Sequence, residues 1–211
     1  HGGTVNQLIT VTITGTNDAP TVTAQTPASV AEGAAALTVD ALASASDVDL
    51  NDTLSVVNVQ AVLPAGVTYN AGTHSFTLDP SNAAYNSLAV TEQTQVTVNY
   101  EVSDGIASVP TSITFTVTGT NDAPTVSAHT DGALSEDATD PTLSTSGTIT
   151  FDDADLSDAH TTSVAAAPGN TLGGVLTASV ATGAGAGSVD WSYSVANAAT
   201  QSLSDGQIVT E

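Results

Sequence analysis

The chain has 211 residues, enough for one or two domains, and it combines 22 Asp and Glu residues with no Lys or Arg. Its formal charge is −22 and its pI is near 4.1. Because no cationic side chain can contact phosphate, direct binding to nucleic acid or to an anionic membrane surface is excluded. The absence of Cys also excludes disulfides, thiolate zinc sites and thiol nucleophiles.

Short segments in which apolar and polar residues alternate predict half-buried antiparallel strands. The clearest of them are residues 8–13, 95–102 and 113–117. Turn-forming residues separate such segments, at 63–66, 70–72, 103–105 and 121–124. No stretch has a convincing helical period, so the sequence predicts an all-β fold.

An internal repeat organises these segments. Residues 9–24 and 113–128 are identical at 13 of 16 positions, at an offset of 104 residues. A period of this length is typical of a β-sandwich domain. We expect residues 1–19 to hold the last strand of a preceding repeat and a linker, 20–121 to form a complete sandwich, and 122–211 to form a second sandwich that is truncated before its last strands.

A second repeated feature is acidic. Asp47, Asp49 and Asp52 have counterparts 106 residues later, and Glu32 has one 104 residues later. Three carboxylates within six residues repel one another unless a cation neutralises them, and oxygen donors without nearby His or Cys favour Ca²⁺ over zinc or copper. Such residues are also ordinary loop chemistry, and neither EF-hand nor RTX nonapeptide spacing is present. Their repetition in register favours calcium.

The junction segments carry a resemblance to a known family. Residues 14–22 and 118–126 both read Thr-Gly-Thr-Asn-Asp-Ala-Pro-Thr-Val, which resembles the hallmark of VCBS and related cadherin-like repeats in giant bacterial RTX adhesins. The middle repeat is similar to a cadherin domain in the order of its acidic motifs, which are Glu32, Asp47-x-Asp49, Leu78-Asp79 and Asp104 within residues 102–105. The resemblance implies tandem cadherin- or immunoglobulin-like antiparallel β-sandwich domains joined by short linkers.

The resemblance also implies two calcium sites at the junctions. The first set of ligands is Asn17, Asp18, Asp47, Asp49 and Asp104. The second set is Glu32, Asp79, Asn121, Asp122, Asp153 and Asp155. Gly15 and Gly119 stand where the cadherin linker has an Asp, and residues 80–81 are Pro-Ser instead of Arg-Glu. We therefore expect one or two ions at each junction instead of three.

The function implied by the resemblance is structural and not enzymatic. Calcium shared by neighbouring repeats would stiffen the chain into a spacer of an adhesin that is exported by type I secretion. That adhesin would act extracellularly, at the bacterial cell surface, in cell adhesion and biofilm formation. The four histidines belong to no catalytic motif and are expected at the surface: His1, His74, His129 and His160.

Two alternatives stay open. The first is a carbohydrate-binding sandwich that uses Trp191, although core packing is the default role for this residue. The second is head-to-tail self-association, in which the strand at residues 1–16 inserts into the open edge of a neighbouring chain and propagates a fibre. The plainer explanation of the unpaired strand at residues 1–16 is a sequence cut within a repeat.

Overall fold

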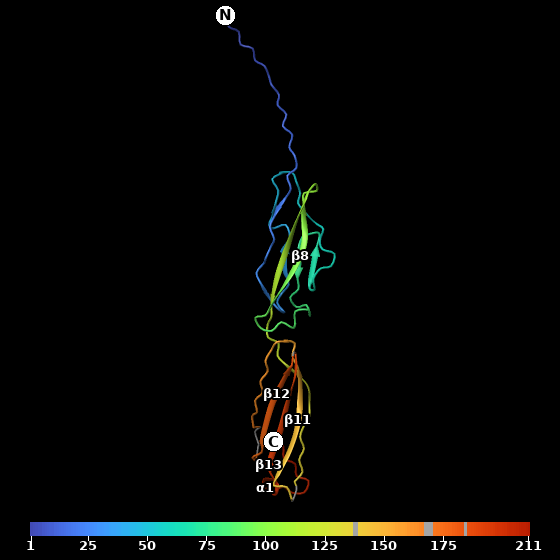
Figure 1. Ribbon diagram of the computed structural model, residues 1–211, viewed down its shortest axis with the longest axis vertical. Helices are drawn as coiled ribbons and strands as arrows, with labels where there is room; N and C mark the ends of the chain where they lie inside the picture. Colours follow the sequence, from blue (N-terminus) through green and yellow to red (C-terminus); the bar gives the residue numbers. More distant parts are fainter. Residues whose placement is uncertain (137–138, 167–170, 184) are drawn as a thin grey trace. The chain divides into compact units, whose positions relative to one another are not determined.

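The computed structural model describes residues 1–136, 139–166, 171–183 and 185–211, and their regular structure is almost entirely β (Figure 1). The all-β prediction is therefore confirmed. Within these ranges α1 (Asn197–Thr200) is the one helix, a single turn long. No helix of the described chain has the length and apolar character needed to cross a bilayer.

Residues 21–118 form three sheets. Their strands are β1 (Thr21–Val22), β2 (Val30–Ala31), β3 (Leu37–Asp40), β4 (Ala45–Ser46), β5 (Ser55–Val57), β6 (Val67–Asn70), β7 (Ser75–Leu78), β8 (Gln93–Ser103) and β9 (Ser108–Thr118). The sheet orders are β1-β4, β3-β7-β6 and β2-β9-β8-β5. Most pairs that meet are antiparallel, but β2 runs parallel to β9, with Val30 opposite Val117. This parallel pair and the isolated parallel bridge between Gln25 and Ile113 depart from the antiparallel arrangement expected from the sequence.

The core of this part follows from the alternation in its two longest strands. In β8, Val98 and Val102 are 0% exposed, whereas the intervening residues are exposed or half-buried, apart from Tyr100 on the same face. In β9, Ile113 and Phe115 are equally buried. Successive side chains of a strand point to opposite faces, so these apolar residues share one face and pack inwards. The strands predicted at residues 95–102 and 113–117 are confirmed.

The C-terminal part contains one four-stranded antiparallel sheet in the order β10-β11-β13-β12. Its strands are β10 (Thr125–His129), β11 (Thr142–Asp152), β12 (Val175–Gly183) and β13 (Ala186–Ala196). Figure 1 shows β11, β12 and β13 side by side. Because β10 and β12 are at the ends of this order, each leaves one side without a strand among the described residues, and the prediction that the second sandwich is truncated stays a prediction.

Trp191 lies opposite Gly147 in the register of β13 and β11. A Cβ at Gly147 would lie 2.6 Å from Cζ2 of the indole, so the ring occupies the space that a side chain would need. Gly132 meets the same ring in the same way. These contacts pack the ring against its neighbours, the default that its sequence context suggested. Trp191 is nevertheless half-buried and lines a pocket, and carbohydrate binding through it stays a prediction.

Neutral hydroxyl pairs join neighbouring strands on their exposed sides. The Oγ1 atoms of Thr38 and Thr77 are 2.8 Å apart. Those of Thr97 and Thr114 are 2.9 Å apart. Such cross-strand hydrogen bonds stabilise a sheet without using charge. They suit a chain that has no cationic side chain to place opposite its carboxylates.

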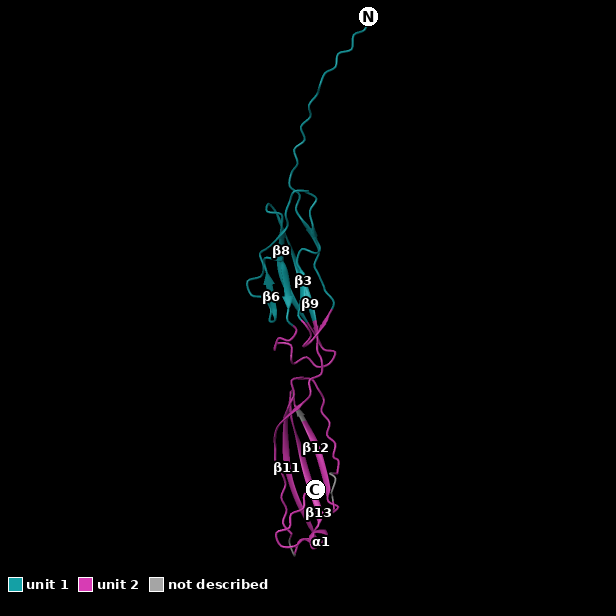
Figure 2. Cartoon of the chain, turned by 180° about the vertical axis from the view of Figure 1, so that it is seen from behind, with its two compact units in different colours: residues 1–28, 36–79, 95–116 teal, residues 29–35, 80–94, 117–211 magenta. Residues whose placement is uncertain are grey.

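The chain divides into two compact units, coloured separately in Figure 2. The first unit comprises residues 1–28, 36–79 and 95–116, and the second comprises 29–35, 80–94 and 117–211. The domain boundaries expected near residues 20 and 122 stay a prediction.

Residues 1–19 form no strand, although alternation predicted one at 8–13. Ile9, Val11 and Ile13 are 77–90% exposed, whereas their repeat counterparts 104 residues later are fully buried in β9. A strand needs a partner for its amides and carbonyls. No strand partner for this segment is present among the described residues, and this explains the difference.

Phe76 tests the packing of the first unit. It is 0% exposed, and its ring centroid is 4.7 Å from that of Tyr69 and 5.3 Å from that of Tyr100. Phe76→Ala leaves a cavity and should lower the free energy of unfolding by about 3–5 kcal/mol. Urea unfolding followed by circular dichroism measures this change. The control Val62→Ala alters a side chain that is 83% exposed and should change stability by less than about 0.5 kcal/mol.

Candidate metal centres

The first acidic cluster lies on the loop that follows β4. Ligand oxygens of Asp47, Asp49 and Asp52 all lie within 4.8 Å of one another. Oδ1 of Asp47 accepts a hydrogen bond of 2.9 Å from the amide of Asp49, which folds the loop into an Asx turn. Oδ2 of Asp47 is buried and has no hydrogen-bond partner. A buried carboxylate oxygen in this state is costly unless a cation completes its coordination.

The N-terminal linker contacts this loop and also the loop between β8 and β9. The amide of Asp18 donates to Oδ2 of Asp49 at 2.9 Å, and Nδ2 of Asn17 donates to Oδ2 of Asp104 at 3.1 Å. The amides of Ala107 and Ile106 donate to Oδ1 of Asp104 and hold the pKa of that carboxyl below its ordinary value. The structure thus brings together the whole first set of predicted ligands.

Asp52 belongs to this cluster but was not among the predicted ligands. Burial raises the pKa of its carboxyl, and the negative charges of Asp49 and Asp47 raise it further. The signal that could have identified it was present in the sequence, since Asp52 returns as Asp158 in the next repeat.

The second cluster, on the loop that follows β11, repeats the hydrogen bonds of the first. The amide of Asp155 donates to Oδ1 of Asp153 at 3.0 Å. The amide of Asp122 donates to Oδ2 of Asp155 at 2.8 Å, as Asp18 does to Asp49. Nδ2 of Asn121 donates to the carbonyl of Asp122, as Asn17 does to that of Asp18. The same linker motif therefore docks on the same acidic loop in both units.

The second cluster is the more deeply buried. Asp155 is 0% exposed and Glu32 is 9% exposed, and each has one buried oxygen with no hydrogen-bond partner, Oδ1 and Oε2 respectively. Burial raises the pKa of Glu32, and the charges of Asp122 and Asp155 raise it further, against a hydrogen bond from the backbone of Thr120 that lowers it. Glu32, Asp122 and Asp155 therefore share one negative site, and the donor chemistry fits a hard cation.

His160 also contacts this cluster, through Nε2, which lies 2.8 Å from Oδ2 of Asp153. That hydrogen bond is the main reason why the pKa of Asp153 lies below its ordinary value. The side chain of His160 is only 8% exposed, so the expectation that all four histidines lie at the surface is wrong for this one. Its position two residues after Asp158 was the only sequence signal of its role.

Asp79, the remaining predicted ligand, belongs to the first unit, whereas Glu32 and Asp122 belong to the second. It is exposed directly after β7, and its amide donates to the carbonyl of Gly66 at 2.8 Å. Its assignment to the second calcium site stays a prediction.

Gly119 explains one departure from the cadherin linker. A Cβ at this position would lie 2.1 Å from the carbonyl oxygen of Leu88 and 2.4 Å from that of Ala89. No side chain fits there, so an Asp cannot occupy the position. At Gly15, its repeat counterpart, an added Cβ would meet no atom within 4 Å, so this constraint does not apply.

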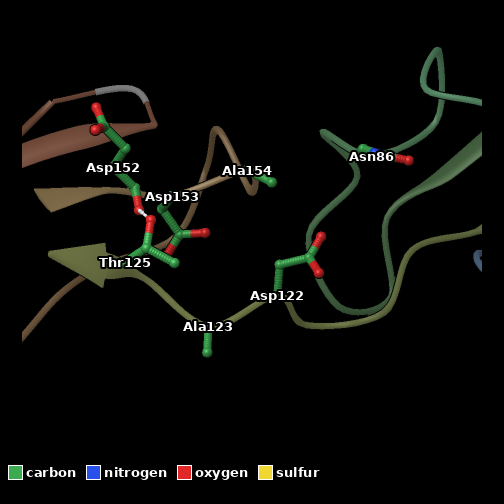
Figure 3. Close-up of a pocket in the computed structure, with 7 residues that line it drawn as sticks. All are labelled: Asn86, Asp122, Ala123, Thr125, Asp152, Asp153 and Ala154. Atoms are coloured by element: carbon green, nitrogen blue, oxygen red, sulfur yellow. Dashed lines mark hydrogen bonds between the residues drawn. The ribbon is translucent and has the colours of Figure 1, made fainter. Parts of the chain in front are cut away.

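A pocket opens beside the second cluster (Figure 3). Its lining residues are Asn86, Asp122, Ala123, Thr125, Asp152, Asp153 and Ala154. Asn86 is a further oxygen donor at this pocket that sequence reasoning missed, because it lies in a loop with no repeated acidic motif.

Residues 16–118 match the family model described as a cadherin-like domain. The β-sandwich fold of this region is therefore cadherin-like. Such domains are typical of extracellular, adhesion-type modules, commonly bind calcium, and point to a non-enzymatic role. No curated protein matches the chain.

Two similar solved structures have low identity to the chain. One is the endo-fucoidan hydrolase MfFcnA4 from glycoside hydrolase family 107, with 13% identity, a TM-score of 0.35, and coverage of 84% of this chain and 24% of that chain. The other contains the titin domains z1z2 in complex with telethonin, with 12% identity, a TM-score of 0.30, and coverage of 83% and 82%. The chain thus spans about a quarter of the length of the hydrolase.

Glu32 gives a pH-dependent prediction for the calcium-free chain. Because its pKa is higher in the folded than in the unfolded chain, its contribution to stability is present below the ordinary value of 4.5 and is lost as the pH rises through the raised pKa. Glu32→Gln should therefore reduce the loss of stability between about pH 4 and about pH 7. Urea unfolding in a chelator measures this. The control Glu136→Gln changes an exposed repeat counterpart and should leave the wild-type pH dependence intact.

Proposed function

We propose that this chain is a calcium-stiffened spacer of a secreted bacterial surface adhesin, acting outside the cell in adhesion and biofilm formation. The observation that carries the proposal is a set of buried carboxylate oxygens without partners, in a chain that has no Lys or Arg. They are Oδ2 of Asp47, Oδ1 of Asp155 and Oε2 of Glu32. Calcium, which binds six to eight oxygens, matches this donor chemistry.

The residues that would hold calcium come from a linker and from two loops in each unit. In the first unit, Asn17 and Asp18 join Asp47, Asp49 and Asp104. In the second unit, Asn121, Asp122 and Glu32 join Asp153 and Asp155. A bound ion supplies the positive charge that these carboxylates lack, and it ties the linker to the loop. The segment leading from one repeat to the next then loses its freedom to hinge.

The setting of such a module follows from the same chemistry. Sites with few carboxylates bind calcium weakly, and extracellular modules function at millimolar calcium. In the low-calcium cytosol the uncompensated carboxylates would disfavour folding, which suits a chain exported unfolded by type I secretion. The cadherin-like match over residues 16–118 supports an extracellular, adhesion-type role.

Calcium removal tests the proposal. Millimolar Ca²⁺ should raise the melting temperature by about 10 °C or more and give a stiffer small-angle scattering profile, whereas Mg²⁺ should do neither. Asp49→Asn and Asp155→Asn should each remove about half of the rise in melting temperature. The matched control Asp205→Asn, at an exposed residue outside both clusters, should keep the full rise. A wild-type melting temperature that does not respond to Ca²⁺ would exclude the proposal.

A second candidate function is head-to-tail self-association through residues 1–16, favoured by the exposure of their apolar side chains. Ile13 is 90% exposed, but its repeat counterpart Val117 is 0% exposed and pairs in parallel with Val30. The repeat places Leu134, which is 38% exposed, at the position of Val30. By this register Ile13 of a second copy would pair with Leu134, and its apolar face would then be buried.

Engineered cysteines test this pairing directly, because the chain has no Cys of its own. A protein with Ile13→Cys and Leu134→Cys should form a ladder of disulfide-linked oligomers on mild oxidation, since paired strands bring Cβ atoms within disulfide reach. Deletion of residues 1–14 should abolish oligomers. The control pair of Val5→Cys and Leu134→Cys, out of register, should cross-link at least about tenfold less. Equal cross-linking in both pairs would contradict the register.

A further inference from the structure

The two acidic loops share their backbone hydrogen bonds but differ at one carboxylate oxygen. In both loops the first Asp accepts the amide of the Asp two residues later, at 2.9 Å for Asp47 and 3.0 Å for Asp153. The second oxygen of Asp47 is buried with no partner, whereas the second oxygen of Asp153 contacts Nε2 of His160 at 2.8 Å. One loop therefore leaves an oxygen open that the other has already filled.

The difference arises because the two repeats have different residues at the same position after the acidic loop. His160 lies seven residues after Asp153, and the residue seven after Asp47 is Leu54. A leucine side chain cannot donate a hydrogen bond, so it cannot replace the water that Oδ2 of Asp47 loses on burial. An imidazole can donate one, and Nε2 of His160 lies at hydrogen-bond distance from the carboxylate of Asp153.

His160 is held firmly in this place. Its side chain is 8% exposed and that of Asp153 is 1% exposed. Its ring packs on Phe151, with centroids 4.7 Å apart and planes at 55°. Nδ1 is buried and has no hydrogen-bond partner, which favours the tautomer whose proton is on Nε2, facing Asp153.

We infer that His160 is a positioning residue that engages Oδ2 of Asp153 in place of a cation and removes this carboxylate from the calcium ligands of the second site. The inference rests on the proposed calcium function. Its consequence is an asymmetry between two sites that the repeat makes look identical. The loop of the second unit is partly ordered without calcium by its own side chain, while the loop of the first unit depends on the ion.

Reciprocal substitutions test this inference, with each site measured while the other is disabled. In an Asp49→Asn background, His160→Leu frees the Asp153 oxygen, and calorimetric titration should show calcium binding at least tenfold tighter or one further equivalent. The calcium-induced rise in melting temperature should also grow, because the calcium-free loop loses its internal partner. The conservative variant His160→Gln keeps a donor and should resemble the parent.

The opposite change belongs to the first unit. In an Asp155→Asn background, Leu54→His should weaken calcium binding at least tenfold and make the melting temperature less dependent on calcium. This arm remains informative if His160→Leu fails to fold, because it alters the other unit.

The outcomes separate this inference from the proposed function. If the parent proteins bind calcium but His160→Leu lowers stability equally with and without the ion and leaves the titration unchanged, His160 is only a structural residue and the inference is overturned. An unchanged titration in Leu54→His overturns it as well. If the wild-type chain releases no binding heat with Ca²⁺, both the function and the inference fail.

Discussion

Repulsion among carboxylates that no internal cation can neutralise is the constraint on which the acidic loops of this structure depend. The chain answers it with backbone dipoles, since the amides of Asp18, Asp49, Asp122 and Asp155 all donate to carboxylate oxygens. An amide contributes only a partial charge. Some carboxylate oxygens therefore remain buried without a hydrogen-bond partner. The negative charge of the folded loops is thus only partly compensated. This uncompensated charge connects the local geometry of the turns with the proposed role of calcium, which would neutralise it.

The sequence predicted those features that depend on local pattern. Alternation identified β8 and β9 because a strand with one buried face must repeat every two residues. The repeat placed the two acidic loops in register, because a duplicated fold places equivalent residues in equivalent positions, whereas their role as calcium ligands stays a prediction. Contacts between distant segments left no such signal. The parallel pairing of β2 with β9 and the burial of His160 against Phe151 were therefore missed, and residues 8–13 had strand character without a strand partner.

Duplication preserved the backbone of the acidic loops while their surroundings diverged. Asp49 is half-buried, but its counterpart Asp155 is completely buried. Gly15 is unconstrained, but Gly119 lies against two backbone carbonyls. Identical motifs can therefore bind an ion with different strength, because desolvation and steric fit are properties of the environment and not of the motif. A count of ligands taken from one repeat does not transfer to the next.

The hydroxyl pairs across the strands have a consequence for how the protein responds to its medium. A hydrogen bond between Thr38 and Thr77, or between Thr97 and Thr114, carries no charge for dissolved ions to screen. High and low salt concentrations should therefore leave these cross-strand hydrogen bonds equally strong. The dependence of stability on salt concentration should therefore arise elsewhere, above all from the carboxylates, whose mutual repulsion dissolved ions screen. The hydroxyl pairs can thus join the strands equally at different salt concentrations, while the acidic loops respond to the ions present.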